Sequence, residues 1–403
     1  MIYFNNAAKA RFDPTVVATG MSRLQQEPWE LQQDDTAKDV VRQLFGRLIG
    51  ASGSDISVMP STAFAITLAA MNVCHDSTRA GGKILILQDQ YPSAVYPWQD
   101  LCASATDKFA LEIVPYPQED ETWTSLILAR LNDANDDICV ACLPPLFWCD
   151  GTVVDLNVIG PVCKQKGIVL IVDATQAVGI YPVDVQRIQP ALLACSTHKW
   201  LRGPAGTCLV YVDPDYVAAW QPLDQHDRAR DWHGRSVADR DTLGPTGYPA
   251  DFLPGARKFD SGGRTQPILM PMLQEALEKV VQINVCQAQG QLRVLMQPLY
   301  DWASDAASPV HPLPPRQHHA AHIWGVRPRT PLTTPQMLAM VQRLQDEFGI
   351  VVSVRCGIFR IAPYLDNTSQ DVQHLVEALS TVLKSQSLQE KQESSVSSCK
   401  ARL

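Results

Sequence analysis

Four short apolar runs are the feature of this sequence that most restricts its fold. They lie at Lys83–Leu87, Ile138–Leu143, Ile168–Val172 and Thr207–Val212, and each is bounded by polar residues, proline or glycine. Apolar residues do not alternate with polar ones within a run, and helical stretches such as Leu156–Gln165 separate most of the runs. This pattern is typical of parallel strands that helices cover on both faces. The sequence therefore predicts a doubly wound α/β domain, whose ligands bind beyond the carboxyl ends of the strands.

Composition excludes several classes of protein. Of the 403 residues, 46% are hydrophobic and 19% are charged, which supplies a large core and rules out a chain that is disordered throughout. No run reaches the ~18–20 uninterrupted apolar residues of a membrane helix, so we expect no membrane span. The N-terminus lacks a basic region followed by a long apolar stretch, so we expect no secretory signal. The net charge of −8 argues against non-specific binding of nucleic acid.

Cysteine and histidine spacing predicts no metal site. The eleven cysteines are scattered, which is typical of reduced, mostly buried thiols in a cytosolic compartment. Cys139 and Cys142 form a C-x-x-C pair, but it falls within a run that has the pattern of a buried strand. His318, His319 and His322 cluster without a cysteine or carboxylate set, so we interpret them as surface or strand histidines.

The second part of the chain predicts a smaller α+β domain. Helical periodicity over Pro267–Gln289 could link it to the first domain. Beyond the link we expect strands at His322–Val326 and Ile350–Val354, with helices at Thr334–Phe348 and Ser369–Leu383. Before this link, the stretch Gln221–Leu253 is rich in Asp, Arg, Gly and Pro, which predicts a long irregular excursion that forms a lid or a subunit contact.

Two neighbouring motifs point to the chemistry, since the common nucleotide and hydrolase motifs are missing from this sequence. In IVLIVDATQAVG, Asp173 ends a buried strand, where a carboxylate is costly to bury without a cationic partner. In STHKW, Lys199 stands among Ser, Thr and His, just before a Gly/Pro loop. Such surroundings suit a lysine that forms a Schiff base, because desolvation and nearby cations favour the neutral amine.

These motifs resemble those of the class V aminotransferase superfamily, which are enzymes that depend on pyridoxal 5'-phosphate (PLP) and include cysteine desulfurases, cystine C–S lyases and isopenicillin epimerases. The resemblance runs from Tyr3 to about Leu383 and depends on VDATQAVG and STHKW together with the following GPAG. It implies PLP fold type I, with a large doubly wound domain on a mainly parallel sheet and a smaller C-terminal α+β domain. The implied parts are an N-terminal segment over the active site (1–20), the large PLP-binding domain (21–270), the small domain (271–384) and a disordered tail (385–403).

The resemblance also implies how the cofactor is held. Lys199 would form the Schiff base and move the substrate's α-proton, and Asp173 would pair with the pyridine nitrogen. Gln176 would donate to the phenolic oxygen of the ring. The phosphate would be bound by Ser196 and His198, which flank the lysine, and by the start of a helix at Thr62 and Ala63. Without the resemblance, Ser-Thr before a helix indicates only an N-cap.

Other positions are assigned by the same resemblance. Tyr91 would stack on the cofactor ring, with a core tyrosine as the alternative, and Trp148 would lie near the cofactor oxygen. Arg360 would bind the substrate carboxylate through two parallel hydrogen bonds, and Asn6 belongs to the segment that folds over the substrate. Gly263 lies in a loop that relatives send into the neighbouring subunit, which implies a homodimer with shared active sites. Arg264 departs from the common pattern there, and its role stays open.

Two departures bear on the reaction. A desulfurase needs a thiolate on a mobile loop before the carboxylate-binding arginine, but Cys356 lies only four residues before Arg360. Trp148 replaces the asparagine usual in desulfurases, as in the cystine C–S lyase branch. The sequence thus favours a PLP enzyme that acts at the α-carbon of a small amino acid by β-elimination at a C–S bond. Aminotransferase, then epimerase or racemase, then desulfurase remain as alternatives, followed by a non-catalytic scaffold.

The expected location is the cytoplasm. The C-terminal tripeptide Ala401-Arg402-Leu403 has the small-basic-Leu form of a peroxisomal signal, which gives the alternative.

Overall fold

The computed structural model describes the chain in nine stretches, and for residues 385–400 it describes the backbone alone. Those stretches are 1–27, 29–31, 35–79, 81–105, 109–118, 120–133, 137–234, 248–262 and 266–400. The chain divides into two compact units. We call Ala10–Pro145 with Val154–Ile283 the large unit, and Met1–Lys9, Leu146–Val153 and Asn284–Leu403 together the small unit. Gly263, Arg264 and the C-terminal tripeptide lie outside the described residues.

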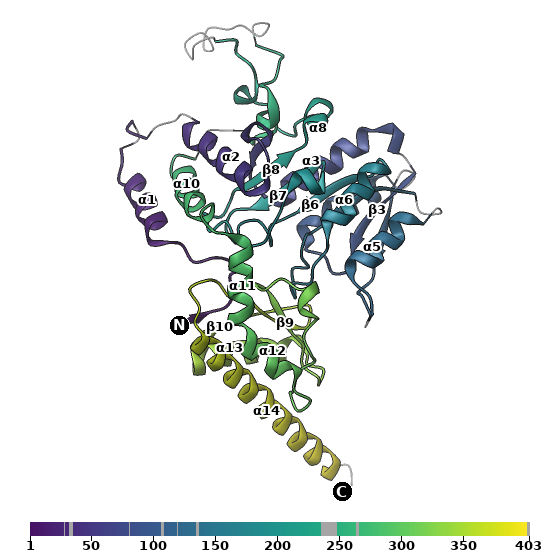
Figure 1. The fold of residues 1–403 in the computed structure, drawn as a ribbon, viewed down its shortest axis with the longest axis vertical. Coiled ribbons are helices and arrows are strands. Elements are labelled where there is room, and N and C mark those ends of the chain that lie inside the picture. The colour runs from purple at the N-terminus through teal and green to yellow at the C-terminus, as the bar shows by residue number, and fades with distance from the viewer. Residues whose placement is uncertain are drawn as a thin grey trace. The chain divides into compact units, whose positions relative to one another are not determined.

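A seven-stranded sheet forms the centre of the large unit (Figure 1), with strands in the order β2-β8-β7-β6-β5-β3-β4. Six strands run in one direction, and β8 runs antiparallel to them, between β2 and β7. The bounds are β2 Ile56–Met59, β3 Gly82–Leu87, β4 Phe109–Val114, β5 Ile138–Leu143, β6 Val169–Asp173, β7 Leu192–Ser196 and β8 Cys208–Val212.

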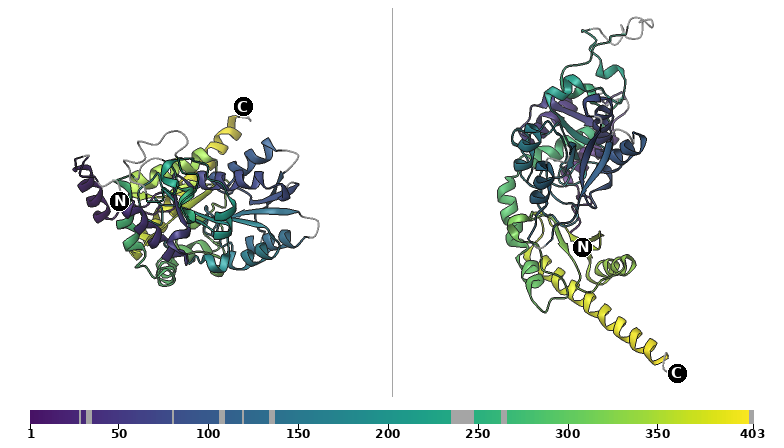
Figure 2. Two further views of the ribbon diagram at one scale, coloured as in Figure 1. Left: turned by 90° about the horizontal axis from the view of Figure 1, so that it is seen from above. Right: turned by 90° about the vertical axis from the view of Figure 1, so that its right-hand side faces the viewer.

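Helices cover both faces of this sheet (Figure 2), as the apolar runs predict. All residues of β6 and β8 are buried, because successive side chains of a strand point to opposite faces and both faces are covered. The helices of the large unit are α1 Pro14–Leu24, α2 Thr36–Ile49, α3 Thr62–His75, α4 Tyr96–Ser104, α5 Trp123–Asn132, α6 Leu156–Gln165, α7 Val185–Ile188, α8 Pro214–Ala219 and α10 Leu269–Val280.

One strand direction differs from the prediction. The run at Thr207–Val212 has the pattern of a parallel strand, but β8 is antiparallel to β7. The reason is the connection 197–207, which contains no helix that could carry the chain across the sheet. Burial on both faces produces the same apolar pattern in either direction, so the pattern identified the strand but could not give its direction.

The small unit contains two short sheets and its own core. Strand β1 (Ile2–Tyr3) pairs in parallel with β10 (Ile350–Val351), and β12 (Ile358–Ile361) lies between β11 (Ser353–Arg355) and β9 (Trp324–Val326) in an antiparallel sheet. A separate apolar cluster includes Phe4, Trp324, Leu344, Phe359 and Leu375. The helices are α11 Val285–Leu295, α12 Gln297–Ser304, α13 Thr334–Phe348 and α14 Ser369–Lys400. This arrangement confirms the expected α+β class of the smaller part.

The predicted linking helix at Pro267–Gln289 is two helices. α10 ends at Val280, and Asn284 caps the start of α11 by accepting a hydrogen bond from the Gln287 N–H. An asparagine that competes for backbone hydrogen bonds favours such a break, and this signal was present in the sequence. At the other end of the chain, α14 continues to Lys400, across the segment for which the sequence predicts a disordered tail.

The excursion at Gln221–Leu253 is described at its two ends. Arg230 and Phe252 form an antiparallel bridge, and the Leu253 N–H donates to the Ala229 carbonyl at 2.9 Å. These contacts pair the two described ends of the excursion with each other. Within the described part of the chain, no helix is long and apolar enough to cross a membrane.

Candidate active site

Asp173 is a buried carboxylate at the carboxyl end of β6. Its side chain is 8% exposed and accepts a hydrogen bond from the Thr175 N–H at 3.1 Å. Burial raises the pKa of Asp173, and neither the Thr175 hydrogen bonds nor the attraction of Lys199 offsets that effect. Within the described residues Asp173 has no ion-pair partner, so the structure buries a carboxylate whose charge lacks a direct counterion.

Three hydroxyl groups meet beside the strand ends. Thr62, in the first turn of α3, places its hydroxyl 2.8 Å from that of Ser196 at the end of β7, and 3.4 Å from that of Thr175. The Ser196 N–H donates to the Thr175 hydroxyl at 3.1 Å. As expected, Ser61 caps α3 by accepting a hydrogen bond from the Phe64 N–H. The first N–H groups of a helix lack partners within the helix, so this cluster combines hydroxyls with a helix start that favours anions.

Lys199 lies in the turn that follows β7 and is almost fully buried. Its amine is 4.9 Å from the centre of the Tyr91 ring. The turn is held by Thr197, whose hydroxyl lies 2.5 Å from the Pro204 carbonyl and 3.0 Å from the Thr207 carbonyl. Thr197 is fully buried, so the Gly/Pro loop closes on a residue of the STHKW motif itself. The lysine is therefore presented by a fixed turn.

The VDATQAVG and STHKW motifs contact each other directly. The Trp200 indole N–H donates to the Gln176 side-chain carbonyl at 2.8 Å, which fixes the rotation of the amide. Gly179 has φ +100°, and a Cβ there would lie 2.7 Å from the Trp200 carbonyl oxygen. Only glycine permits both that backbone conformation and that approach. The His198 carbonyl accepts a hydrogen bond from the Ala10 N–H at 3.0 Å, which attaches the lysine turn to the segment before α1.

Gln90 positions the segment that carries Tyr91. Its side-chain carbonyl accepts from the Leu87 N–H at 2.9 Å, and its amide donates to the Cys142 carbonyl at 3.0 Å. The residue thereby ties the ends of β3 and β5 together just before Tyr91, whose side chain is 38% exposed. Sequence reasoning passed over Gln90, although a polar residue soon after a buried strand was the available signal.

In the small unit, Arg360 is placed by Trp148. Arg360 lies in the middle of β12 and is 2% exposed. Its guanidinium donates to the Trp148 carbonyl at 3.1 Å and lies 5.6 Å from the centre of the Trp148 ring. Asn6 is also buried, and its amide donates to the Ala362 carbonyl at 2.9 Å, just beyond β12. Residues from three distant parts of the sequence thus meet at one strand.

A buried histidine holds the turn that follows Trp148. His319 places its Nε2 2.6 Å from the Asp150 carbonyl, and His322 places its Nδ1 2.9 Å from the Gln289 amide. His318 is exposed and His319 pairs with Thr152 in an antiparallel bridge, as the interpretation of surface or strand histidines expects, whereas His322 is buried in a turn. Burial lowers the pKa of His319 to about 3. In the described residues no group of three or more His, Cys, Asp or Glu is arranged to hold a metal ion.

The structure thus groups the predicted site residues in two sets. The large unit brings together Asp173, Gln176, Ser196 and Lys199 with Thr62 and Tyr91, while Ala63 stands beside Thr62 at the start of α3 and His198 precedes the lysine. The small unit brings together Trp148 and Arg360, with Asn6 anchored near them. Thr175, which sequence reasoning missed, connects Asp173 to the hydroxyl cluster; its position two residues after the strand end could have suggested it.

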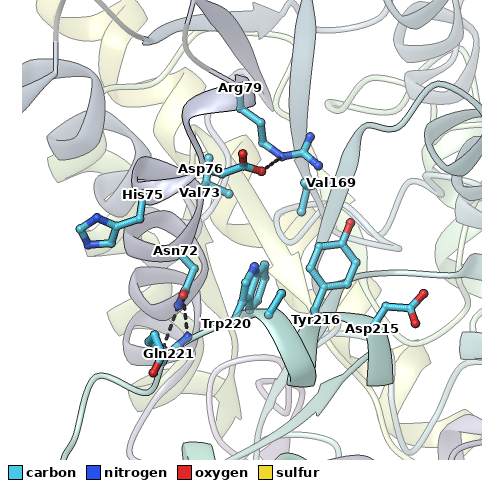
Figure 3. A pocket seen from close by; sticks show the side chains of 11 residues that line it. Asn72, Val73, His75, Asp76, Arg79, Val169, Asp215, Tyr216, Trp220 and Gln221 are labelled. Atoms are coloured by element: carbon cyan, nitrogen blue, oxygen red, sulfur yellow. Dashed lines mark hydrogen bonds and ion pairs between the residues drawn. The ribbon is translucent and has the colours of Figure 1, made fainter.

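The large unit also contains a cavity of about 480 Å³ away from these residues (Figure 3). Val169, the first residue of β6, lines it, whereas Asp173 is the last residue of that strand. In Figure 3 the Arg79 guanidinium turns to Asp76, and the Asn72 amide meets the Gln221 backbone. The cavity therefore opens at the amino end of β6, and no predicted site residue lines it.

The model of the aminotransferase class V family matches residues 2–228, more than half of the chain. The chain belongs to the aminotransferase class V family. It is therefore a PLP-dependent enzyme, as that family is. One relative is an uncharacterized aminotransferase, YcbU of Bacillus subtilis, which is 23% identical over 85% of this chain and 82% of that protein. Cysteine desulfurase IscS of Shewanella denitrificans is 27% identical, over 52% of this chain and 53% of its own length.

Solved structures of other proteins share the fold of this chain. The apo cysteine desulfurase of Thermococcus onnurineus superposes with a TM-score of 0.79 at 17% identity, over 95% of both chains. The cystine C–S lyase C-DES, in complex with cysteine persulfide, superposes with a TM-score of 0.79 at 18% identity, over 94% of this chain and 97% of that one. The fold is accordingly PLP fold type I, as the sequence predicts.

Proposed function

We propose that this enzyme is a C–S lyase that eliminates a β-thiolate from a small sulfur-containing amino acid. The observation that carries the proposal is the hairpin of β11 and β12. Arg355 pairs with Ile358, so only Cys356 and Gly357 form the turn, with φ 48° and 70°. Two left-handed residues are typical of a tight type I′ turn. A thiol held there lacks the mobile loop that a desulfurase uses, which favours elimination over persulfide transfer.

The large unit suits PLP through its buried carboxylate. Asp173 lacks an ion-pair partner in the described residues, and a protonated pyridine nitrogen would supply the missing positive charge. When bound, PLP supplies an electron sink for the electron pair left at the substrate's α-carbon. Asp173 would keep that sink effective by holding the proton on the ring nitrogen.

The hydroxyl cluster suits the phosphate. Thr62, Thr175 and Ser196 present adjacent hydroxyls, and the start of α3 adds N–H donors at Thr62 and Ala63. His198 would add a further contact from beside the lysine. Gln176, oriented by Trp200, would contact the phenolic oxygen, and Gly263 would contribute from the partner subunit.

Lys199 would bind the cofactor and act as the proton carrier at the α-carbon. Its turn is fixed through Thr197, and the Tyr91 ring lies against its amine, so the lysine is held in place before substrate arrives. Tyr91 would stack on the cofactor ring. Removal of the α-proton leaves the electron pair that expels the β-thiolate, and hydrolysis of the remaining product gives pyruvate and ammonia.

Arg360 would bind the α-carboxylate of the substrate. Its guanidinium is already oriented by the Trp148 carbonyl and the Trp148 ring, so little ordering is needed when the carboxylate arrives. Asn6 would close over the substrate from its anchor at Ala362. We also propose a homodimer and a cytoplasmic location, as the sequence predicts.

An aminotransferase is the second candidate. The relative that matches 82% of its own length bears that description, and the same lysine, aspartate and arginine serve transamination if the proton is returned to the cofactor. The two candidates differ in one requirement: a lyase turns over without a keto acid, whereas an aminotransferase stops after one half-reaction.

The test compares turnover with and without a keto acid. Purified enzyme saturated with PLP is incubated with cystine, cysteine and a panel of amino acids, and pyruvate and the cofactor's absorbance are followed in the same samples. Continuous pyruvate from cystine, with the absorbance of the PLP form retained, is expected. Stoichiometric loss of that absorbance, restored only by a keto acid, would replace the lyase by an aminotransferase.

A further inference from the structure

The buried carboxylate of Asp260 binds the outer edge of strand β2. This strand lies at one end of the seven-stranded sheet, and its inner edge pairs with β8. On the outer edge, the Val58 N–H donates to the Asp260 carboxylate at 2.9 Å, and the Val58 carbonyl accepts from the Ser261 N–H at 3.1 Å. A side chain and the residue after it thus bind the backbone groups that a further strand would use.

Arg42 of α2 fixes Asp260 in turn. Its guanidinium donates to both carboxylate oxygens, with a distance of 3.1 Å between Nη1 and Oδ1, and Nη1 also donates to the Ile56 carbonyl of β2 at 2.6 Å. Arg42 and Asp260 are both buried, and the Lys38 amine lies 3.6 Å from the carboxylate. A buried carboxylate with this set of partners has one favourable position, because moving it would leave charges unpaired in the interior.

The position of β2 decides where Thr62 lies. Met59, the last residue of β2, pairs with Cys208 on β8, and Cys208 pairs on its other side with Ser196 of β7. Only two residues separate Met59 from Thr62, whose hydroxyl lies 2.8 Å from that of Ser196. A shift of β2 along β8 would therefore move the Thr62 hydroxyl and the start of α3 away from Ser196.

We propose that Asp260 is a positioning residue for the cofactor phosphate and acts through β2 and Thr62. By holding β2 in register, it keeps the hydroxyls of Thr62 and Ser196 adjacent before the phosphate arrives. Apolar residues of similar volume stabilise a core as well as a buried ion pair does, so stability alone does not account for this one. The inference rests on the phosphate role proposed above for Thr62, and it does not depend on which reaction the enzyme catalyses.

The test compares PLP with pyridoxal, which lacks the phosphate but forms the same Schiff base with a lysine. Purified enzyme is freed of cofactor and dialysed to equilibrium against each compound, and the ratio of the two dissociation constants measures what the phosphate contributes. Asp260→Asn keeps an oxygen for the Val58 N–H but loses the charge that pairs with Arg42. We expect PLP binding to weaken on the order of tenfold, the size of one hydrogen bond to a charged group, and pyridoxal binding to stay unchanged.

A double-mutant cycle shows whether Asp260 acts through Thr62. Thr62→Val should itself lower the ratio, and adding Asp260→Asn should then weaken PLP binding clearly less than it does in the wild type, because the hydroxyl that Asp260 positions is gone. Arg42→Lys keeps the charge but loses the paired donors, so it should lower the ratio by less than Asp260→Asn does. If Asp260→Asn does not fold, Arg42→Lys takes its place in the cycle under the same criteria.

Arg79→Ala is the structural control. Arg79 donates to the Gly167 carbonyl at 3.0 Å and to the Cys139 carbonyl at 3.3 Å, and it lines the cavity at the amino end of β6. Its loss removes partly buried hydrogen bonds of the same unit far along the sheet from Thr62. This variant should melt at a lower temperature, with the ratio unchanged.

Three results would overturn the inference. They are a folded Asp260→Asn enzyme with an unchanged ratio, an equal weakening of PLP and pyridoxal binding, and an equal loss of PLP affinity with and without the Thr62 hydroxyl. A ratio that Thr62→Val leaves unchanged would remove the phosphate role of Thr62 and the inference with it. That last result is read from binding alone, so it is distinct from a failure of the proposed lyase reaction.

Discussion

The two sets of site residues are positioned by different means. In the large unit, Asp173 and Ser196 stand at the ends of neighbouring parallel strands, and short motifs around them supply Gln176 and Lys199. In the small unit, Arg360 is placed by the Trp148 carbonyl, 212 residues away in sequence. The first set therefore follows from local sequence and sheet topology, whereas the second depends on contacts between distant segments. Mutations should separate the two: large-unit changes should affect the cofactor, and small-unit changes the substrate.

The largest expected effect is at Lys199. Lys199→Ala removes the amine that would bind the cofactor and move the proton, so we expect turnover to be abolished, as measured by pyruvate formation with excess PLP. Circular dichroism should show an intact fold. Lys164→Ala, at an exposed lysine of α6, is the control and should keep full activity. An active Lys199→Ala enzyme would remove the lysine from the mechanism.

Asp173→Asn should affect the apo and the PLP-loaded enzyme in opposite directions. In the apo-protein burial raises the pKa of Asp173 above its ordinary 3.8, so the folded state binds this proton more tightly than the unfolded state. Stability then falls as pH rises from 3.8 through the folded pKa, and the neutral asparagine avoids that loss. We expect the apo variant to melt at a higher temperature at pH 7, with the difference vanishing below pH 3.8.

With PLP, the same substitution breaks a buried charge pair and should weaken cofactor binding by about 3–5 kcal/mol. Equilibrium dialysis with PLP measures that loss, and calorimetry of the apo-protein measures the gain. A destabilised apo variant with unchanged PLP affinity would show that Asp173 is a structural residue.

Arg360 should act on the substrate alone. Arg360→Lys keeps the charge but loses the planar pair of donors, and Arg360→Ala loses both. We expect Arg360→Ala to raise KM for the amino acid by a factor equivalent to about 2–3 kcal/mol of binding free energy, and Arg360→Lys to raise it by less. PLP affinity should stay unchanged. Arg343→Ala, at a partly exposed arginine of α13 that pairs with Glu347, should leave KM at its original value. Equal losses of PLP and substrate binding would contradict the separation of the two sets.

Gln90 should give the smallest effect. Gln90→Ala removes two buried hydrogen bonds between the ends of β3 and β5, so we expect a loss of about 1–3 kcal/mol in the free energy of unfolding, measured with urea. Turnover should fall only slightly, since the substitution leaves the Tyr91 side chain itself unchanged. The exposed Gln99→Ala on α4 is the control. No change in stability would mean that these bonds are replaced by water.

Part of the large unit carries local signals in the sequence, whereas the roles of Gln176, Ser196 and Tyr91 were assigned by the family resemblance and remain predictions. The apolar runs gave four strands, the strand end gave Asp173, and the Ser-Thr pair gave the start of α3. It could not give the direction of β8, since burial on both faces looks the same in either direction. It also missed Gln90 and Thr175, whose partners are backbone and side-chain groups of other strands. The contact of Arg360 with Trp148 needs the folded chain, because no local pattern encodes it.

The products formed from cystine test the central claim most directly. Wild-type enzyme, loaded with PLP and given no keto acid, is allowed many turnovers, and pyruvate, ammonia and alanine are quantified together. A β-eliminating C–S lyase gives pyruvate and ammonia in equal amounts, with no alanine and no decline of the cofactor's absorbance. Alanine with transferable sulfur would instead mean desulfuration, and a single equivalent of keto acid per enzyme would mean transamination; either result would contradict the account.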